Sequence, residues 1–253
     1  MKWIRCSHQN RTFYGTLEND RVHEVSGSPF EQYEKTDRVH ALADVQIEVP
    51  VIPRTFYCVG LNYVKHIGTE GRSIPAQPDV GYRANNALIA HGQDVVMPAD
   101  ATKVQYEGEL VVVIGKQAKN LSREEARSCI FGYTIGNDVS ERVWQKSDRT
   151  FWRAKNTDTF KPMGPFIETD PKLEGMETVV SVNGKESMRF DTGDMLFGID
   201  EFISTMSRYL TLYPGDVIWM GTDGHSPDLQ PGDVVDVSIT GLGVLSNRFV
   251  REG

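Results

Sequence analysis

From residue 54 onward the chain is a series of short apolar runs separated by Gly, Pro, Asn and Asp, and this pattern limits the fold most strongly. The runs are TFYCVG, NALIA, DVVMP, ELVVVIG, YTIGNDV, TVVSVNG, GDVIWMG and GDVVDVSITGLGVL. Helical periodicity is confined to residues 121–131, where Ser122 and Glu125 have capping-box spacing, and to residues 200–209. Many strands with few helices predict a mixed-β fold rather than a doubly wound α/β sheet.

The first 53 residues differ from the rest in the length and spacing of their apolar pieces. Short alternating segments such as KWIRC, TFYGTLEND and RVHEVSG are separated by turn signals. Pro50 and Pro53 then interrupt the pattern. We therefore predict a small N-terminal β domain over residues 1–53 and a larger domain over residues 54–253.

Charge and cysteine content exclude some classes of protein. The net charge of −8 argues against nucleic acid as a partner, although a local metal ion or a few basic side chains can still hold an anionic substrate. No apolar stretch has the length of a membrane span, and the first residues lack the apolar core of a signal peptide. Three scattered cysteines fit neither a disulfide framework nor a CxxC metal site, so a reducing cytoplasm is expected and Cys58 and Cys129 are expected to be buried.

Two glutamates precede the most apolar run of the chain. In the stretch YEGELVVVIG, Glu107 and Glu109 are two residues apart, so on a strand their side chains lie on the same face. Two carboxylates this close repel each other unless a cation lies between them. Asp138, which follows the apolar run of YTIGND, is a third candidate ligand for a hard divalent cation such as Mg²⁺. Spacing alone leaves open that Asp138 only caps a turn after the strand.

Four sequence blocks occur in an order that resembles the fumarylacetoacetate hydrolase family, especially its bacterial acylpyruvase and 2-hydroxyhepta-2,4-diene-1,7-dioate isomerase-like members. The blocks are YEGELVVVIGK, FGYTIGNDVSER, KNTDTFKPMGP and LYPGDVIWMGT. The resemblance extends over residues 57–247 and implies a β-roll around a divalent metal, in a chain that forms a homodimer. It also implies that Glu107, Glu109 and Asp138 bind Mg²⁺ or Mn²⁺, and that the substrate is a small 2-oxo acid.

The resemblance assigns further roles to basic and polar residues. Lys155 matches a lysine that points into the family's site, whereas without the resemblance it would be an exposed lysine with its stem packed on an aromatic ring. Arg142 and Gln145 match positions near the substrate, and a surface salt bridge is the alternative for Arg142. Gly221 and Thr222 match the segment that receives the substrate carboxylate in the family, and a tight turn is the alternative for them. Arg83 would take the place of a cation that the family often has in another segment.

The segment GLNYVKHIGTEG contains the candidate general base. His66 matches a family histidine on a short lid helix, and its near-neutral pKa would suit the activation of water. The family's acid lies three residues after this histidine, where the chain has Thr69, so Glu70 would have to replace it. Gly68 and Gly71 weaken a helix at this place.

These residues predict an enzyme and leave two classes of reaction open. The first is a metal-dependent hydrolase that cleaves a C–C bond of a β-diketo acid, of the acylpyruvate or fumarylpyruvate type, through a metal-bound enolate with His66 as base. The alternative is a lyase or isomerase, either an oxaloacetate-type decarboxylase or a 2-hydroxyhepta-2,4-diene-1,7-dioate isomerase, which needs the metal and Lys155 but no His–Glu pair. A non-catalytic binding protein is a third hypothesis, which the complete set of three carboxylates disfavours.

Overall fold

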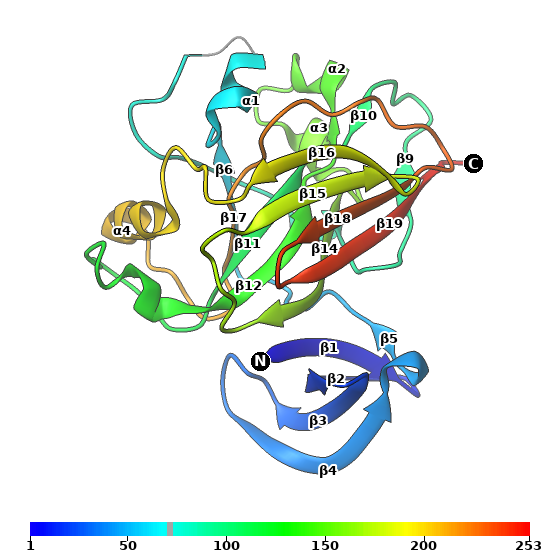
Figure 1. Ribbon diagram of the computed structural model, residues 1–253, viewed down its shortest axis with the longest axis vertical. Helices are drawn as coiled ribbons and strands as arrows, with labels where there is room; N and C mark the ends of the chain where they lie inside the picture. The colour runs from blue at the N-terminus through cyan, green and yellow to red at the C-terminus, as the bar shows by residue number, and fades with distance from the viewer. Residues whose placement is uncertain (70–72) are drawn as a thin grey trace.

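The structure, a computed structural model, describes residues 1–69 and 73–253 and is built mainly from three β-sheets (Figure 1). The largest sheet has twelve strands, of which ten follow the order β4-β3-β2-β1-β14-β12-β11-β17-β6-β7. A five-stranded sheet has the order β16-β15-β18-β19-β9, and β10 and β13 form a separate pair. The predicted mixed-β fold is confirmed.

The first five strands form an appendage that Figure 1 shows in blue beside the rest of the molecule. They are β1 Lys2–His8, β2 Arg11–Glu18, β3 Arg21–Gly27, β4 Tyr33–Ala41 and β5 Gln46–Ile47. β1 also pairs with β14, so the appendage continues the large sheet. The predicted domain boundary at residues 53 and 54 stays a prediction.

The centre of the large sheet is buried on both faces. Beyond the appendage the sheet contains β14 Lys161–Glu168, β12 Ile130–Asn137, β11 Gly108–Ile114, β17 Val217–Trp219 and β6 Phe56–Gly60, and it ends at the edge strand β7 Asp79–Tyr82, with β8 Leu88–Ile89 attached to β14. All seven residues of β11 are buried, and alternate residues belong to two different apolar clusters: Leu110 and Val112 lie in one, Val111 and Val113 in the other. This double burial explains why the run is continuously apolar rather than alternating.

The five-stranded sheet packs closely against β11. Its strands are β16 Lys185–Asp191, β15 Glu177–Val182, β18 Val234–Ile239, β19 Gly243–Arg251 and β9 Val95–Met97; the separate pair is β10 Val104–Gln105 with β13 Ser140–Glu141. At Gly108 a Cβ atom would lie 2.8 Å from Cγ2 of Val180 and 2.9 Å from Cγ1 of Val237. Glycine therefore permits the approach of the two sheets at the point where the two glutamates begin β11.

Helices are short and few among the described residues. They are α1 Val64–Thr69, α2 Arg142–Gln145, α3 Trp152–Asn156 and α4 Ile199–Tyr209, with 3₁₀ turns η1 Leu42–Asp44, η2 Asn85–Ala87 and η3 Ala126–Cys129. The helix predicted over residues 200–209 is confirmed as α4, which buries Phe202, Ile203 and Met206. None of the helices in the described ranges has the length and apolar character that crossing a membrane requires.

The helix predicted over residues 121–131 is wrong. Ser122 and Glu125 do exchange the two hydrogen bonds of a capping box, at 3.0 and 3.3 Å. Only the 3₁₀ turn η3 follows, because the chain becomes extended at Ile130, which pairs with Ile114 in the large sheet. Tertiary strand pairing thus overrides the local helical signal. The expectation for the cysteines is confirmed, since Cys58 and Cys129 are both buried.

Candidate active site

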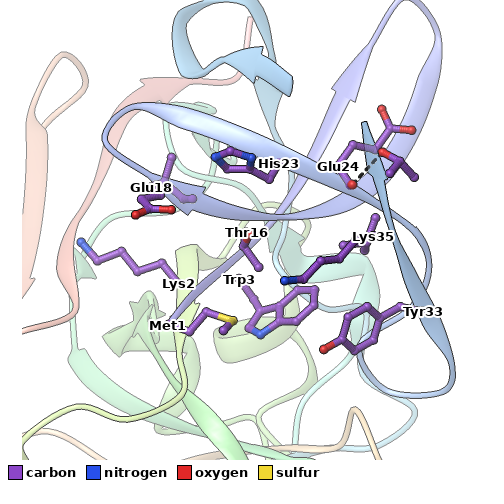
Figure 2. A pocket seen from close by; sticks show the side chains of 12 residues that line it. Met1, Lys2, Trp3, Thr16, Glu18, His23, Glu24, Tyr33 and Lys35 are labelled. Carbon is purple, nitrogen blue, oxygen red and sulfur yellow. Dashed lines mark hydrogen bonds between the residues drawn. The ribbon is translucent and has the colours of Figure 1, made fainter. Parts of the chain in front are cut away.

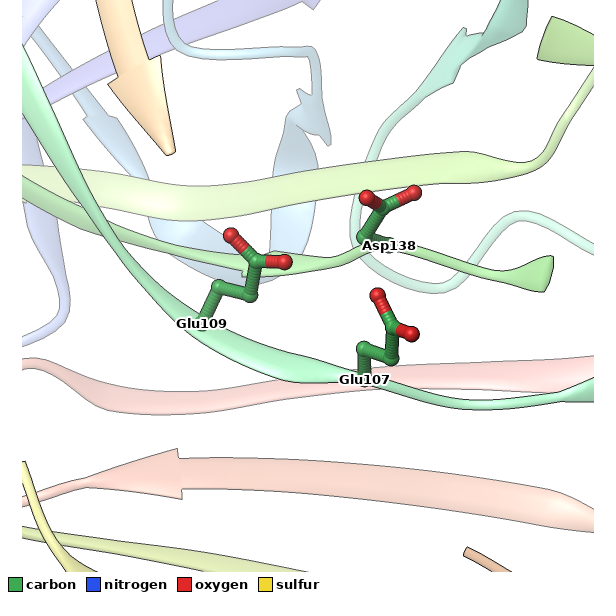
Figure 3. A group of neighbouring side chains, drawn as sticks. All are labelled: Glu107, Glu109 and Asp138. Carbon is green, nitrogen blue, oxygen red and sulfur yellow. The ribbon is translucent and has the colours of Figure 1, made fainter. Parts of the chain in front are cut away.

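The pairing of β11 with β12 brings the three predicted metal ligands together. Glu109 lies in β11 opposite Gly136, Glu107 immediately precedes β11, and Asp138 immediately follows β12. The backbone N–H of Asp138 donates to the carbonyl oxygen of Glu107 at 2.9 Å, so the ladder extends one step past the strands. Figure 3 shows the three carboxyl groups gathered over the same side of β11.

All three carboxylates are buried, and one carboxyl oxygen from each lies within 4.8 Å of one from each of the others. Burial raises the pKa of Glu109 well above its ordinary value, and the neighbouring charges of Asp138 and Glu107 raise it further. Burial and the two neighbouring carboxylates therefore both favour the protonated form of Glu109, and a cation bound beside it would favour the ionised form. The backbone N–H of Gly221 donates to Oε2 of Glu109 at 2.8 Å.

Three basic side chains meet at Asp138. The Oδ2 atom lies 2.9 Å from Nη2 of Arg83 and 3.2 Å from Nζ of Lys155, and Oδ1 lies 2.7 Å from Nζ of Lys161. Burial alone would raise the pKa of Asp138, but these three cations outweigh it and hold the pKa well below its ordinary range. Asp138 is thus kept ionised, which is the form that a metal ligand requires.

Lys155 connects two of the carboxylates. It is buried at the inner face of α3, and its Nζ atom lies 2.5 Å from Oε2 of Glu107 as well as 3.2 Å from Asp138. The structure thus places an ammonium group beside the triad of Glu107, Glu109 and Asp138, as the resemblance implied. The alternative of an exposed lysine is wrong.

Arg142 contacts the triad from α2. Its Nη2 atom lies 2.7 Å from Oε1 of Glu107, its Nη1–H donates to Oε1 of Gln145 at 2.9 Å, and its Nε–H donates to Oε1 of Gln105 at 2.8 Å. Arg142 is therefore engaged in an internal network and not in a surface salt bridge. Gln145 lines the same cavity as the triad.

The cavity beside the triad has a volume of about 90 Å³. Gly221 and Thr222 lie in its wall together with Asn62 and Phe151. The Oγ1 atom of Thr222 is buried and has no hydrogen-bond partner within the described part of the chain. A buried hydroxyl without a partner is costly, so this atom is suited to a ligand in the cavity.

The residues present fit a divalent metal ion. Three buried carboxylates supply hard oxygen ligands, with one oxygen from each within 4.8 Å of the others, and a cation among them would offset the repulsion that helps to raise the pKa of Glu109. Glu107, Glu109 and Asp138 would hold the ion. These ligands do not distinguish Mg²⁺ from Mn²⁺.

The candidate base and its acid are only partly described. His66 lies in α1, which begins two residues after the cavity residue Asn62, and the placement of its side chain is outside the description. Glu70 lies outside the described residues. The proposed roles of both residues stay predictions.

Sequence reasoning missed three residues that support the triad. Lys161 is completely buried, and its Nζ–H groups donate to the carbonyl oxygens of Val139 and Phe160 at 2.9 Å in addition to pairing with Asp138. Asn137 accepts the backbone N–H of Glu107 on Oδ1 at 3.1 Å, and Gln105 holds Arg142. Lys161 lies in the block KNTDTFKPMGP, and a lysine between Phe and Pro was the available signal.

A larger cavity of about 410 Å³ lies in the appendage (Figure 2). Trp3, Tyr33 and Lys35 line it, with the rings of Trp3 and Tyr33 in edge contact at 4.9 Å. Its buried acid, Glu24, already has three basic partners, Arg11, Arg38 and His40. The described residues of this cavity therefore offer no carboxylate cluster for a metal, and the triad remains the candidate site.

Comparison with known proteins agrees with the geometry. The family model "Fumarylacetoacetate (FAA) hydrolase C-terminal" matches residues 55–250, and the model "Rv2993c-like, N-terminal" matches residues 1–50. Protein Rv2993c of Mycobacterium tuberculosis is 39% identical over 91% of this chain and 88% of its own length. Oxaloacetate tautomerase YisK of Bacillus subtilis is 35% identical over 83% of this chain and 75% of its own.

A solved structure has the same fold along the whole chain. The structure of 2-hydroxyhepta-2,4-diene-1,7-dioate isomerase from Mycobacterium marinum superposes with a TM-score of 0.91 at 35% identity, covering 100% of this chain and 99% of that one. Because the family model covers most of the chain and the acidic triad lies within it, this protein belongs to the fumarylacetoacetate hydrolase family.

Proposed function

We propose that this protein catalyses the metal-dependent interconversion of the enol and keto forms of a 2-oxo acid. The observation that carries the proposal is the position of Lys155, whose buried ammonium group lies beside two carboxylates of the candidate metal site. An isomerisation of this kind moves one proton and needs a proton carrier next to the place where the 2-oxo group binds. Two of the similar proteins described above have names that denote an isomerase or a tautomerase, which supports the same reaction class.

The side chains of the site have separable tasks in this proposal. Glu107, Glu109 and Asp138 hold Mg²⁺ or Mn²⁺, which when bound polarises the oxygen atoms of the 2-oxo acid and lowers the cost of negative charge on them. Lys155 delivers or removes the proton, with Glu107 as its partner at 2.5 Å. Thr222 and the neighbouring backbone receive the substrate carboxylate in the cavity.

C–C bond hydrolysis of a β-diketo acid is the second candidate. It is favoured by the position of α1, which carries His66 and begins two residues after the cavity residue Asn62. Hydrolysis needs a base that activates water, and His66 is the residue that would do so. Lys155 is compatible with both reactions, so assays with two different substrates are needed to separate them.

The test supplies oxaloacetate in its enol form and acetylpyruvate to the protein with Mg²⁺. Isomerisation is followed as loss of the enol absorbance, and both decarboxylation and hydrolysis as release of pyruvate. We expect enol loss that stops on chelation of the metal, with little pyruvate formed. Rapid pyruvate release from acetylpyruvate that His66→Ala abolishes would favour hydrolysis and contradict the proposal.

We further propose that the chain forms a homodimer through the outer face of α3. Trp152 of α3 and Tyr82 at the end of β7 are 68% and 57% exposed and line one cavity, an uncommon position for two large aromatic rings. Light scattering should give the mass of two chains, and Trp152→Glu should reduce it to one. A wild-type mass of one chain would contradict this proposal.

A further inference from the structure

Two cations of the candidate site meet at one oxygen atom although they come from distant parts of the chain. Nη2 of Arg83 lies 2.9 Å from Oδ2 of Asp138, and Nζ of Lys155 lies 3.2 Å from the same atom. Arg83 directly follows β7, whereas Lys155 lies in α3. Both side chains are long and have many rotamers, so a shared contact of this kind depends on how well the two backbone segments are held relative to each other.

The side chain of Asn156 connects these two segments. Asn156 is the last residue of α3 and directly follows Lys155. Its Oδ1 atom accepts the backbone N–H of Ala84, the neighbour of Arg83, at 2.7 Å. Its Nδ2–H donates to the carbonyl oxygen of Phe151 at 3.0 Å. A backbone N–H can only donate and a carbonyl oxygen can only accept, so these two partners fix the orientation of the amide.

The second of these bonds supports a strained residue in the wall of the triad cavity. Phe151 lines that cavity and has φ 54° and ψ 26°, a left-handed conformation that is a true outlier for a bulky side chain. Such conformations persist only where the surrounding contacts hold them. The carbonyl oxygen of Phe151 accepts the backbone N–H of Lys155 at 3.0 Å as well as the amide of Asn156. The turn from which α3 starts, and with it the direction of Lys155, is therefore held partly by Asn156.

Asn156 acts from outside the site. The described lining of the triad cavity includes Phe151 and Lys155 but not Asn156, which lines the cavity on the outer face of α3 instead. Its side chain thus has to influence a bound ligand through the residues that it holds. An amide supplies a donor and an acceptor on one short side chain, and alanine supplies neither.

We propose that Asn156 is a positioning residue, which keeps Lys155 and Arg83 in the relative placement that a ligand beside the triad requires. The inference rests on the proposed function in one respect, namely that Lys155 acts on a 2-oxo acid bound at the triad. It adds that the accuracy of this placement is set from outside the cavity, by the side chain that follows Lys155.

The test measures binding first and turnover second. Isothermal titration calorimetry with Mg²⁺ follows the binding of oxalate, which imitates the enolate of pyruvate. Asn156→Ala should weaken oxalate binding about ten-fold, the loss expected when two part-buried hydrogen bonds that hold the site are removed. Titration of Mn²⁺ alone should give an affinity close to that of wild type, which also shows that the variant is folded. The kcat of enol loss should fall by at least about ten-fold, with a smaller change in KM.

Asn86→Ala is the matched control. Asn86 lines the same outer cavity and donates from Nδ2 to the backbone carbonyl oxygen of Asn156 at 3.1 Å, but it takes no part in the amide bridge. This variant should bind oxalate as wild type does. Asn156→Ser is a second test variant, because its hydroxyl group is too short to reach both partners, and the same loss is expected.

The Lys155→Met background separates positioning from a general loosening of the fold. Asn156→Ala should weaken oxalate binding less in this background than in wild type, because the residue through which Asn156 acts is gone. A general loosening of α3 would cost the same in both. Lys172→Met is the control for Lys155→Met, since Lys172 is an exposed lysine outside both cavities.

Four results would overturn the inference. They are wild-type oxalate affinity in both Asn156 variants, an equal loss in the two backgrounds, an equal loss of Mn²⁺ and oxalate affinity in Asn156→Ala, and the absence of oxalate binding in wild type. Isomerisation with the same kcat in wild type and Asn156→Ala would also contradict it. A protein that shows the expected binding pattern yet isomerises no 2-oxo acid would instead overturn the proposed function alone.

Discussion

The Nζ atom of Lys155 lies 2.5 Å from Oε2 of Glu107 and 3.2 Å from Oδ2 of Asp138. In this arrangement an ammonium group neutralises part of the charge that a divalent ion would also neutralise. Binding of the ion would compete with these ion pairs and weaken them. In the proposed function the same lysine would both stabilise the metal-free site and supply the proton to the reaction.

Lys155→Met should abolish isomerisation without unfolding the chain. We expect a loss of at least about 100-fold in kcat, the range in which a positioned proton donor acts, with a smaller change in metal affinity. Stopped-flow measurement of enol loss gives kcat, and Lys172→Met is the control. An unchanged kcat would contradict the assignment of Lys155 as proton carrier.

Glu109→Gln should stabilise the metal-free protein at neutral and alkaline pH. Because the pKa of Glu109 is raised in the folded state, its stabilising contribution is present below the unfolded value of 4.5 and is lost as the pH rises through the folded value. The amide imitates the protonated acid at every pH. We expect the variant to melt about 2–4 °C higher than wild type at pH 8, the shift that about 1 kcal/mol produces in a chain of this size, with the gap closing toward pH 4.5. A variant that melts lower at pH 8 would contradict this account.

Glu24→Gln should destabilise the appendage by an amount that vanishes in acid. Burial alone would raise the pKa of Glu24, but hydrogen bonds from Arg11 and His40 and the charges of Arg11 and Arg38 lower it to about 2. The contribution of Glu24 to stability is therefore complete above pH 4.5, its ordinary pKa, and is lost as the pH falls toward its folded pKa of about 2.

This shift corresponds to roughly 3 kcal/mol at most, and solvent screening of the exposed Arg11 and Arg38 reduces the expected loss to about 2 kcal/mol at pH 7. Urea unfolding at pH 7 and pH 3 measures it, with Glu18→Gln, an exposed acid of the same cavity, as the control. An equal destabilisation at both pH values would show that charge is not the cause.

Gly108→Ala should disturb both stability and metal binding. The added Cβ would lie 2.8 Å from Val180 and 2.9 Å from Val237, so β11 has to move away from the five-stranded sheet. Overpacking of this kind costs about 1–3 kcal/mol, and it would displace both flanking glutamates. Gly198→Ala is the control, because a Cβ there has nothing within 4 Å. Thermal unfolding with and without Mg²⁺ separates the loss of stability from the loss of metal binding. If Mg²⁺ stabilises Gly108→Ala as much as wild type, the predicted effect on metal binding is contradicted.

Much of the site could be predicted because its ligands lie at the ends of strands with a strong signal. The apolar runs of β11 and β12 identify both strands, and their antiparallel pairing places Glu107 next to Asp138. The helix α4 was equally predictable, because its apolar residues recur with helical periodicity. These elements have local patterns that agree with their tertiary environment.

Other elements could not be predicted because their patterns conflict with their positions. β14 lies between β1 and β12 in the large sheet, yet it contains Pro162 and Pro165, which are rare in central strands. β16 is an edge strand with mostly polar residues and only Met188 and Phe190 buried. Lys161 has only the weak local signal of a lysine between Phe and Pro, since its burial depends on Asp138, which follows β12.

The most direct measurement is a calorimetric titration of Mn²⁺ into wild-type protein and into Glu107→Gln, Glu109→Gln and Asp138→Asn. The account predicts one ion per chain in wild type and a loss of at least about 100-fold in affinity in each variant, since changing even a group behind the ligands costs 10–100-fold. Asp194→Asn, an exposed acid outside the triad, should bind as wild type does. Absence of Mn²⁺ binding in wild type, or equal affinity in all three triad variants and wild type, would contradict the assignment of Glu107, Glu109 and Asp138 as a metal site.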